Sequence, residues 1–233
     1  MATSITRTVV LDLDGTLVDS VYVHVLAWQA AFRDVGLEIP AYRLHGLIGM
    51  GGDRLVTAAA GRAVEDAMGE ELRKRHPRHL EPLFDRILPT RGATELLESL
   101  RCHDFVPVLA SSSDAELTER LVAVVPGAER LLGSIVTGSD AENSKPSGEL
   151  VEVALSRVDA DHAVVVGDAV WDAHAARDAG VPSIGVLTGG IDEAALAEAG
   201  AARCFATPAD LAAHLDDTGS LLPPQRSRTA ART

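Results

Sequence analysis

Two aspartates directly follow the first apolar run of the chain, in the stretch VVLDLDGTLVDS from Val9 to Ser20. Because Asp12 and Asp14 are two residues apart, their side chains start on the same face if the extended geometry continues. Gly15 then allows a sharp turn. A carboxylate pair at such a point can bind a hard cation such as Mg2+, and one carboxylate can attack an electrophilic phosphorus. A solvated acidic turn also explains the pattern.

A second polar group, the serines 111–113 followed by Asp114, ends another apolar run and precedes a helical pattern. Hydroxyls and the free amides of a helix start can bind phosphate oxygens. The alternative is structural, because Ser113 or Asp114 can cap the helix. Both roles are compatible, since Ser111 would lie one turn earlier.

Lys145 and two further aspartates complete the set of candidate residues. Lys145 precedes a proline and a predicted helix start. Such a lysine is commonly a surface charge, but one cation beside carboxylates and a phosphate could meet both. Asp168 follows an apolar run and Asp172 lies four residues later, so both can face the same way on a helix start. The alternatives are N-capping by Asp168 and a solvated position for Asp172.

The elements expected to position these residues are short apolar runs separated by helical patterns. The predicted strands are Thr8–Leu11, Phe105–Ala110, Ser134–Thr137, Ala163–Val166, Ser183–Val186 and Arg203–Phe205. Most have the composition of strands buried on both faces. The helical patterns between the later runs are Asp114–Val125, Gly148–Val158 and Trp171–Ala179. This alternation is typical of a parallel α/β sheet.

One long interval breaks the alternation between the first two predicted strands. Apolar residues recur at three- and four-residue spacing in 27–35, and 57–72 is rich in Ala, Glu and Leu. Most of Val21–Leu88 is therefore predicted to be helical, and Arg91–Leu100 is predicted to be the helix that returns to the sheet. The insertion would lie over the carboxyl end of the first strand, where open α/β sheets bind ligands.

The composition indicates a globular protein. The chain has 233 residues, of which 46% are hydrophobic, enough for a sizeable core. The net charge of −13 argues against unspecific binding to nucleic acid or to an anionic membrane. Cys102 and Cys204 have no partner at metal-binding spacing, so neither zinc nor a disulfide framework is indicated. Without signal-peptide features or a long apolar run, a cytoplasmic protein is expected.

Taken jointly and in this order, the four polar groups resemble the four motifs of the haloacid dehalogenase-like superfamily of phosphohydrolases. DLDGT at 12–16 matches the first motif, Ser111 the second, Lys145 the third and GDAVWD at 167–172 the fourth. The resemblance covers Val9 to about Phe205. It points to the subgroup that contains phosphoglycolate phosphatase and β-phosphoglucomutase.

The residue patterns and the resemblance together predict an α/β protein with two parts. A Rossmann-like core, a parallel sheet with helices on both faces, is expected for 1–18 and 89–216. A helical cap inserted after the first strand, similar to the family's C1 cap, is expected for 19–88. The tail 217–233 is predicted to be disordered, because it is rich in Gly, Ser, Pro and Arg.

The resemblance implies a role for each motif residue. Asp12 would attack the substrate phosphorus and form an aspartyl phosphate, while Asp14 would protonate the leaving alcohol and then activate water. Ser111, the backbone amide of Ser112 and Lys145 would hold the phosphoryl group. The residues implied to bind Mg2+ are Asp12, Asp14 through its backbone carbonyl, Asp168 and, at or near the metal, Asp172.

Asp14 also favours phosphoryl transfer within the superfamily, because the dehalogenase branch lacks an aspartate two residues after its nucleophile. Ala169 departs from members that have Ser in a GDS motif, which removes one hydroxyl and no carboxylate. The expected activity is Mg2+-dependent hydrolysis of a small phosphorylated metabolite by a monomer or a homodimer. A sugar phosphomutase of the β-phosphoglucomutase type and a non-enzymatic phospho-accepting or binding protein are the alternatives.

By resemblance, the cap closes over the site and selects the leaving group. His24 lies ten residues after Asp14, similar to a cap-hinge histidine of β-phosphoglucomutase-like members; a plain position on an amphipathic helix is the alternative. In the loop 46–54, Arg54 could meet a second anionic group, although a solvated Arg54 at a helix start is the simpler interpretation. The basic run Arg73–Arg78 is interpreted as a solvated face.

Overall fold

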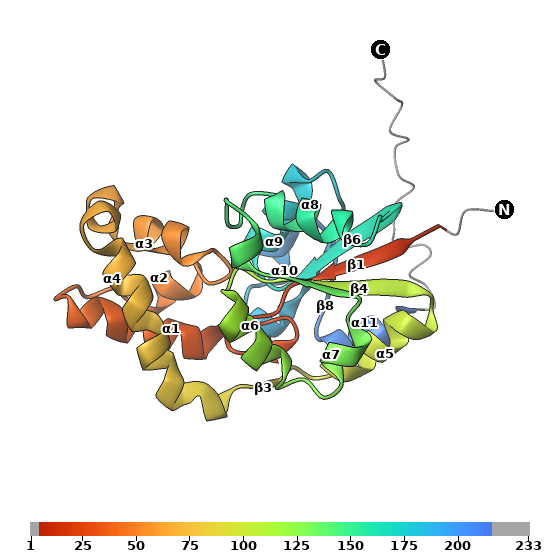
Figure 1. Ribbon diagram of the computed structural model, residues 1–233, viewed down its shortest axis with the longest axis horizontal. Helices are drawn as coiled ribbons and strands as arrows, with labels where there is room; N and C mark the ends of the chain where they lie inside the picture. Colours follow the sequence, from red (N-terminus) through yellow and green to blue (C-terminus); the bar gives the residue numbers. More distant parts are fainter. Residues whose placement is uncertain (1–4, 216–233) are drawn as a thin grey trace, which may run out of the picture.

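The computed structural model describes residues 5–215, which form an α/β core and a helical cap (Figure 1). The core contains a six-stranded parallel sheet in the order β5-β4-β1-β6-β7-β8. Its strands are β1 (Arg7–Leu11), β4 (Phe105–Ala110), β5 (Ser134–Val136), β6 (His162–Gly167), β7 (Ser183–Val186) and β8 (Ala201–Phe205). Each predicted run forms a strand, so the predicted α/β class is confirmed.

Helices cover both faces of this sheet. They are α5 (Ala93–Cys102), α6 (Ala115–Val122), α7 (Ala128–Leu131), α8 (Glu149–Ser156), α9 (Val170–Asp178), α10 (Glu193–Ala199) and α11 (Pro208–Ala213), with the short 3-10 helices η2 (Gly138–Asp140) and η3 (Leu187–Gly189). The central strand β1 shows why two layers are needed, because side chains alternate along a strand. Val9 and Leu11 pack with residues of α5, whereas Val10 packs with residues of α8 and α9.

The insertion forms the cap. Its elements are α1 (Val21–Asp34), α2 (Ala41–His45), α3 (Gly52–Ala60), α4 (Arg62–Leu80) and the 3-10 helix η1 (Glu81–Arg86). Phe32, Leu44, Leu55 and Leu72 belong to an apolar cluster of the cap's own. The chain leaves and re-enters the core through two short strands, β2 (Val18–Asp19) and β3 (Leu88–Pro89), which pair antiparallel.

The structure departs from the predicted helical pattern of 57–72, because Gly61 separates α3 from α4. Its φ of 91° lies in the left-handed region and is incompatible with a continuous right-handed helix. The predicted tail 217–233 lies outside the described residues. Within 5–215, no helix combines the length and the apolar composition that crossing a membrane requires.

Candidate active site

Three adjacent parallel strands deliver the core residues of the site. Leu11 of β1 is in register with Leu109 of β4 and Val166 of β6, so these strands end at the same edge of the sheet. Asp12 and Ser111 directly follow β1 and β4, and Asp168 directly follows β6. The order of the strands therefore brings together residues that are up to about 150 positions apart in the sequence.

Asp12, Asp168 and Asp172 form a buried acidic cluster, with one oxygen of each within 4.8 Å of the others. Lys145 is also buried; its Nζ donates hydrogen bonds to Asp12 and, at 2.7 Å, to Asp172. The structure therefore excludes the surface-charge interpretation of Lys145 and the solvated interpretation of Asp172. Asp168 is not the N-cap of α9 either, since that position belongs to Ala169.

The cluster is rich in negative charge and poor in solvent. Burial raises the pKa of Asp12 to about 7, although the Lys145 ammonium acts in the opposite direction. Burial, followed by the charge of Asp12, also raises the pKa of Asp168 well above its usual value. For Lys145, burial opposes the charged form, but Asp12 and Asp172 raise the pKa above its usual value.

These residues fit a divalent cation. Asp12 Oδ2 is buried and has no hydrogen-bond partner among the described residues, and an unpaired carboxylate oxygen is costly to bury unless a cation balances it. The cluster has three carboxylates and one lysine, so carboxylate oxygens remain available as ligands. Such oxygens are the ligands that Mg2+ prefers. The backbone is shaped for close packing here: Gly15 has a φ of 80°, and a Cβ on it would lie 2.3 Å from Asp168 Oδ2.

Asp14 lies beside this cluster and has different partners. Its Oδ1 accepts hydrogen bonds from Ser20 Oγ and from His24 Nε2 at 2.9 Å, and its Oδ2 accepts one from Ser113 Oγ at 3.4 Å. Burial opposes ionisation, but the adjacent His24 and the Ser20 hydroxyl together lower the pKa of Asp14. In the first motif, the pKa of Asp12 is therefore raised and the pKa of Asp14 is lowered.

The serine-rich segment after β4 contributes to both the site and the helix. Ser111 is buried and its Oγ accepts a hydrogen bond from the Ser113 amide at 3.1 Å. Asp114 caps α6 by accepting from the Leu117 amide at 2.9 Å. Of the two capping residues considered from the sequence, the structure selects Asp114, which leaves the Ser113 hydroxyl for Asp14.

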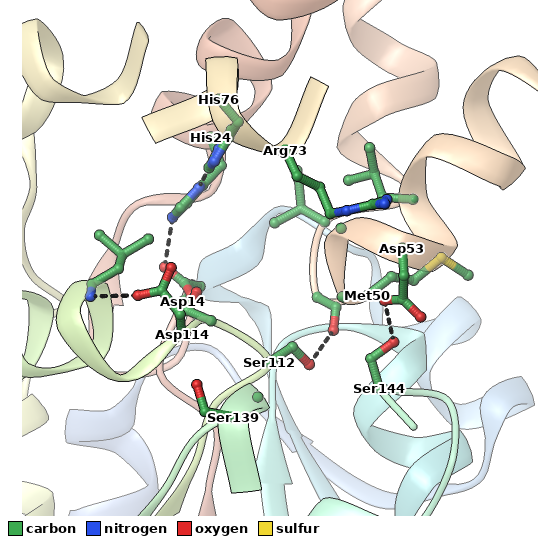
Figure 2. Close-up of a pocket in the computed structure, with 18 of the residues that line it drawn as sticks. Asp14, His24, Met50, Asp53, Arg73, His76, Ser112, Asp114, Ser139 and Ser144 are labelled. Carbon is green, nitrogen blue, oxygen red and sulfur yellow. Dashed lines mark hydrogen bonds and ion pairs between the residues drawn. The ribbon is translucent and has the colours of Figure 1, made fainter. Parts of the chain in front are cut away.

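The loop 46–51 between α2 and α3 closes over the core. Ser112 Oγ donates to the Gly49 carbonyl at 3.2 Å, and Trp171 Nε1 donates to the Gly46 carbonyl at 3.1 Å. Next to this loop, Asp53 accepts from Ser144 Oγ at 2.8 Å. Cap and core together line a cavity of about 450 Å³, and Asp12 and Asp14 are in its lining. Figure 2 shows Asp14 in this cavity.

The roof of the cavity includes two stacked histidines. His24 of α1 reaches down to Asp14, and its Nδ1 lies 3.1 Å from Nε2 of His76 on α4. Trp28 of α1 also stacks on His76, with 4.4 Å between ring centroids. Figure 2 shows His76, His24 and Asp14 in a row from the cap to the core.

Comparison with known proteins agrees with this geometry. Residues 6–180 match the model of the haloacid dehalogenase-like hydrolase family. The chain belongs to this family. The predicted family and the prediction of an enzyme are therefore confirmed.

Individual relatives of this hydrolase agree with its assignment to the family. A phosphoglycolate phosphatase of Caulobacter vibrioides is 31% identical over 80% of this chain and 81% of its own length. A validoxylamine A 7'-phosphate phosphatase of Streptomyces hygroscopicus is 29% identical over 83% and 91%. The crystal structure of a hydrolase from Pseudomonas syringae superposes with a TM-score of 0.86 at 33% identity, covering 91% of this chain and 99% of that one. The predicted phosphatase class agrees with the names of these relatives.

In this hydrolase, two cap residues occupy places that the sequence interpretation missed. The basic run 73–78 is not a fully solvated face, because His76 is buried and Arg73 is in the lining of the cavity. The sequence did contain a signal: Leu72, His76 and Leu80 recur every four residues and are the buried stripe of α4. A histidine within an apolar stripe faces the interior.

Arg54 lies elsewhere. It is exposed near the start of α3 and lines a separate surface depression with residues such as Ser147 and Asp178. This placement matches the simpler interpretation of Arg54 as a solvated residue at a helix start. The arginine that reaches the cavity is Arg73, paired with Glu65 at 2.7 Å.

Proposed function

We propose that this hydrolase cleaves small phosphomonoesters in a Mg2+-dependent reaction through an aspartyl phosphate on Asp12. The observation that carries the proposal is the state of Asp12 itself. One oxygen is fixed by Lys145 and the other has no partner among the described residues, at a cavity large enough for a small metabolite. A fixed carboxylate with a free oxygen suits nucleophilic attack on phosphorus.

The surrounding residues would bind the metal and the phosphate. Asp12, Asp168, Asp172 and the backbone carbonyl of Asp14 would hold Mg2+, which when bound offsets the negative charge of the carboxylates and of the phosphoryl group. Lys145, Ser111 and the amide of Ser112 would hold the phosphate oxygens, with the Lys145 ammonium already fixed by two aspartates. The closed loop 46–51 would exclude bulk water during the transfer.

Asp14 would act as general acid and then as general base. Its lowered pKa makes it a carboxylate before substrate binds, and the approach of a phosphate's negative charge then favours protonation. The protonated form gives its proton to the leaving alcohol. The resulting carboxylate removes a proton from the water that attacks the aspartyl phosphate.

The relatives support hydrolysis more than isomerisation. Those named above are phosphatases for two different phosphomonoesters, so the family relationship leaves the substrate open. A phosphomutase needs a cap site for a second phosphate, and Arg73, the arginine in the cavity lining, is already paired with Glu65. No contact among residues 5–215 favours a non-enzymatic binding protein.

The test measures phosphate release from p-nitrophenyl phosphate and a panel of metabolite monoesters, with Mg2+ and after chelation. Wild type should release phosphate only with metal, and Asp12→Asn should be inactive. Asp14→Asn should lose at least about 100-fold in kcat, the usual contribution of a general acid or base. The exposed Asp85 offers the control Asp85→Asn, which should keep full activity.

Two results would contradict the proposal. Wild type that releases no phosphate from any monoester in the presence of Mg2+ is not a phosphatase of this kind. Retained turnover in Asp12→Asn would show that Asp12 is not the nucleophile. Conversion of a sugar phosphate into its isomer, without net phosphate release, would favour the phosphomutase.

A further inference from the structure

The charges that line the cavity restrict the leaving group of the substrate. Besides Asp12 and Asp14, the lining contains three carboxylates, those of Asp53, Asp114 and Glu142. Among residues 5–215, Arg73 is the only lysine or arginine in that lining. Away from the phosphate-binding floor, the cavity is therefore negative.

The positive charge of Arg73 is already balanced by Glu65. Its guanidinium pairs with Glu65 at 2.7 Å, and the Glu65 side chain is only 18% exposed. Glu65 Oε2 is buried with no hydrogen-bond partner in the described part of the chain. An anionic group that took Arg73 from Glu65 would leave a half-buried carboxylate unpaired, which is costly.

The rest of the lining suits hydroxyl groups and cations. The hydroxyls of Ser112, Ser113, Ser139 and Ser144 line the cavity together with the three carboxylates, and Figure 2 shows Ser112, Ser139 and Ser144 on the core side. Serine hydroxyls and carboxylates accept hydrogen bonds from sugar hydroxyls and from ammonium groups. The volume of about 450 Å³ exceeds what a two-carbon leaving group would fill.

Building on the phosphatase function proposed above, we propose that the substrate is the phosphomonoester of a sugar-sized, hydroxylated molecule with a neutral or positively charged leaving group. A second anion on the substrate, either a carboxylate or another phosphate, is rejected by the rim residues Asp53, Asp114 and Glu142. Phosphoglycolate and sugar bisphosphates are then poor substrates of this chain.

The experiment compares substrates that differ mainly in charge away from the phosphate. Glucosamine 6-phosphate, glucose 6-phosphate and 6-phosphogluconate vary the charge on a six-carbon leaving group. Phosphoethanolamine and 2-phosphoglycolate do so on two carbons, which separates charge from size. We expect kcat/KM to be at least about tenfold lower for each carboxylate than for its neutral or cationic partner, which is roughly 1.4 kcal/mol.

Added salt and charge-neutralising variants test whether the rim carboxylates cause this difference in kcat/KM. Asp53, Asp114 and Glu142 are exposed, so added salt should screen their charges and reduce the ratio. The double variant Asp53→Asn/Glu142→Gln should also reduce it, because two of the three carboxylates become neutral. The double variant Asp66→Asn/Glu98→Gln removes the same charge from exposed positions outside the cavity lining and should keep the wild-type ratio.

The failure of this inference can be told apart from failure of the proposed function. If p-nitrophenyl phosphate is hydrolysed but phosphoglycolate or phosphogluconate is preferred, the inference is overturned and the phosphatase remains. If the rim double variant leaves the ratio unchanged, the rim is not the cause and the inference is equally overturned. If no monoester is hydrolysed at all, the proposed function itself is lost.

Discussion

Two histidines connect the acid/base candidate Asp14 to the interior of the cap. An ionised Asp14 only accepts hydrogen bonds, so the proton in the hydrogen bond between His24 and Asp14 is on His24 Nε2. The opposite ring nitrogen of His24 meets His76. Burial, followed by the charge of His24, lowers the pKa of His76 well below its usual value, so His76 is neutral in the folded protein. Its contact fixes the orientation of the His24 ring.

His76 makes stability depend on pH in a defined direction. In the unfolded chain this histidine takes up a proton below about pH 6.5, whereas in the folded protein it stays neutral. The unfolded state therefore binds more protons, and the free energy of unfolding falls as the pH falls. Between about pH 7.5 and about pH 5.5, wild type should lose up to about 1.4 kcal/mol more than His76→Gln. Urea unfolding at both pH values measures this difference.

The difference between wild type and His76→Gln cancels the contribution of the other titrating groups to the pH dependence. The raised pKa values of Asp12 and Asp168 give the opposite slope in metal-free protein, but they are common to wild type and variant. Gln can still form a hydrogen bond with His24, whereas His76→Leu cannot. Equal pH slopes for wild type and His76→Gln would refute a buried neutral His76. A lower kcat in His76→Leu than in His76→Gln would reveal its positioning role.

At the scale of elements, backbone carbonyls accept three of the hydrogen bonds that join the cap to the core. Trp171 of α9 holds Gly46, Ser112 holds Gly49, and His45 of α2 lies 2.8 Å from the Gly189 carbonyl in η3. Two of these three contacts come from segments that also supply site residues. We therefore expect closure of the cap and assembly of the site to be coupled.

Trp171→Phe should weaken this closure without emptying the interface. Loss of one hydrogen bond of about 0.5 to 1.5 kcal/mol lowers the equilibrium constant for closing by up to roughly tenfold. Amides in the loop 46–51 should exchange hydrogen faster, and kcat/KM should fall by a similar factor. Tyr42→Phe is the matched control, since Tyr42 is 78% exposed on α2. Unchanged exchange in Trp171→Phe would show that the indole hydrogen bond does not hold the loop.

At the scale of the molecule, the cap and the core each have an apolar interior. Leu72 belongs to a cluster made of cap residues, whereas Leu109 of β4 belongs to a cluster that is formed mainly by the core and that also includes Val23, Ala27 and Leu80 at the base of the cap. The chain passes between the two only through the β2–β3 pair. This arrangement allows the cap to lose structure while the sheet persists.

Matched Leu→Ala substitutions should show whether the cap and the core lose structure independently. Leu72→Ala and Leu109→Ala each remove a side chain that is 0% exposed, at a cost of roughly 2 to 5 kcal/mol. In Leu72→Ala, hydrogen exchange should accelerate in α1, α3 and α4 and stay slow in β1 and β4. In Leu109→Ala it should accelerate in the sheet. Equal acceleration throughout the molecule in Leu72→Ala would show that cap and core unfold as one unit.

The sequence by itself determined the strands, the residues at their carboxyl ends and the family. Buried parallel strands appear as continuous apolar runs, and a parallel sheet places all their ends at one edge. Asp12, Ser111 and Asp168 could therefore be placed together without coordinates. Tertiary structure decided that Lys145 is buried between two carboxylates, because that contact depends on segments distant in sequence.

Tertiary structure also decided which cap residues face the cavity. Arg73 and His76 reach the cavity and Arg54 does not. All three are polar residues on helices, and local pattern alone does not fix how a helix is rotated when it packs. The break at Gly61 and the packing of α4 against α1 and α3 set that rotation. The reaction class follows from the chain's local chemistry, whereas the charge of the cavity follows from how the cap packs.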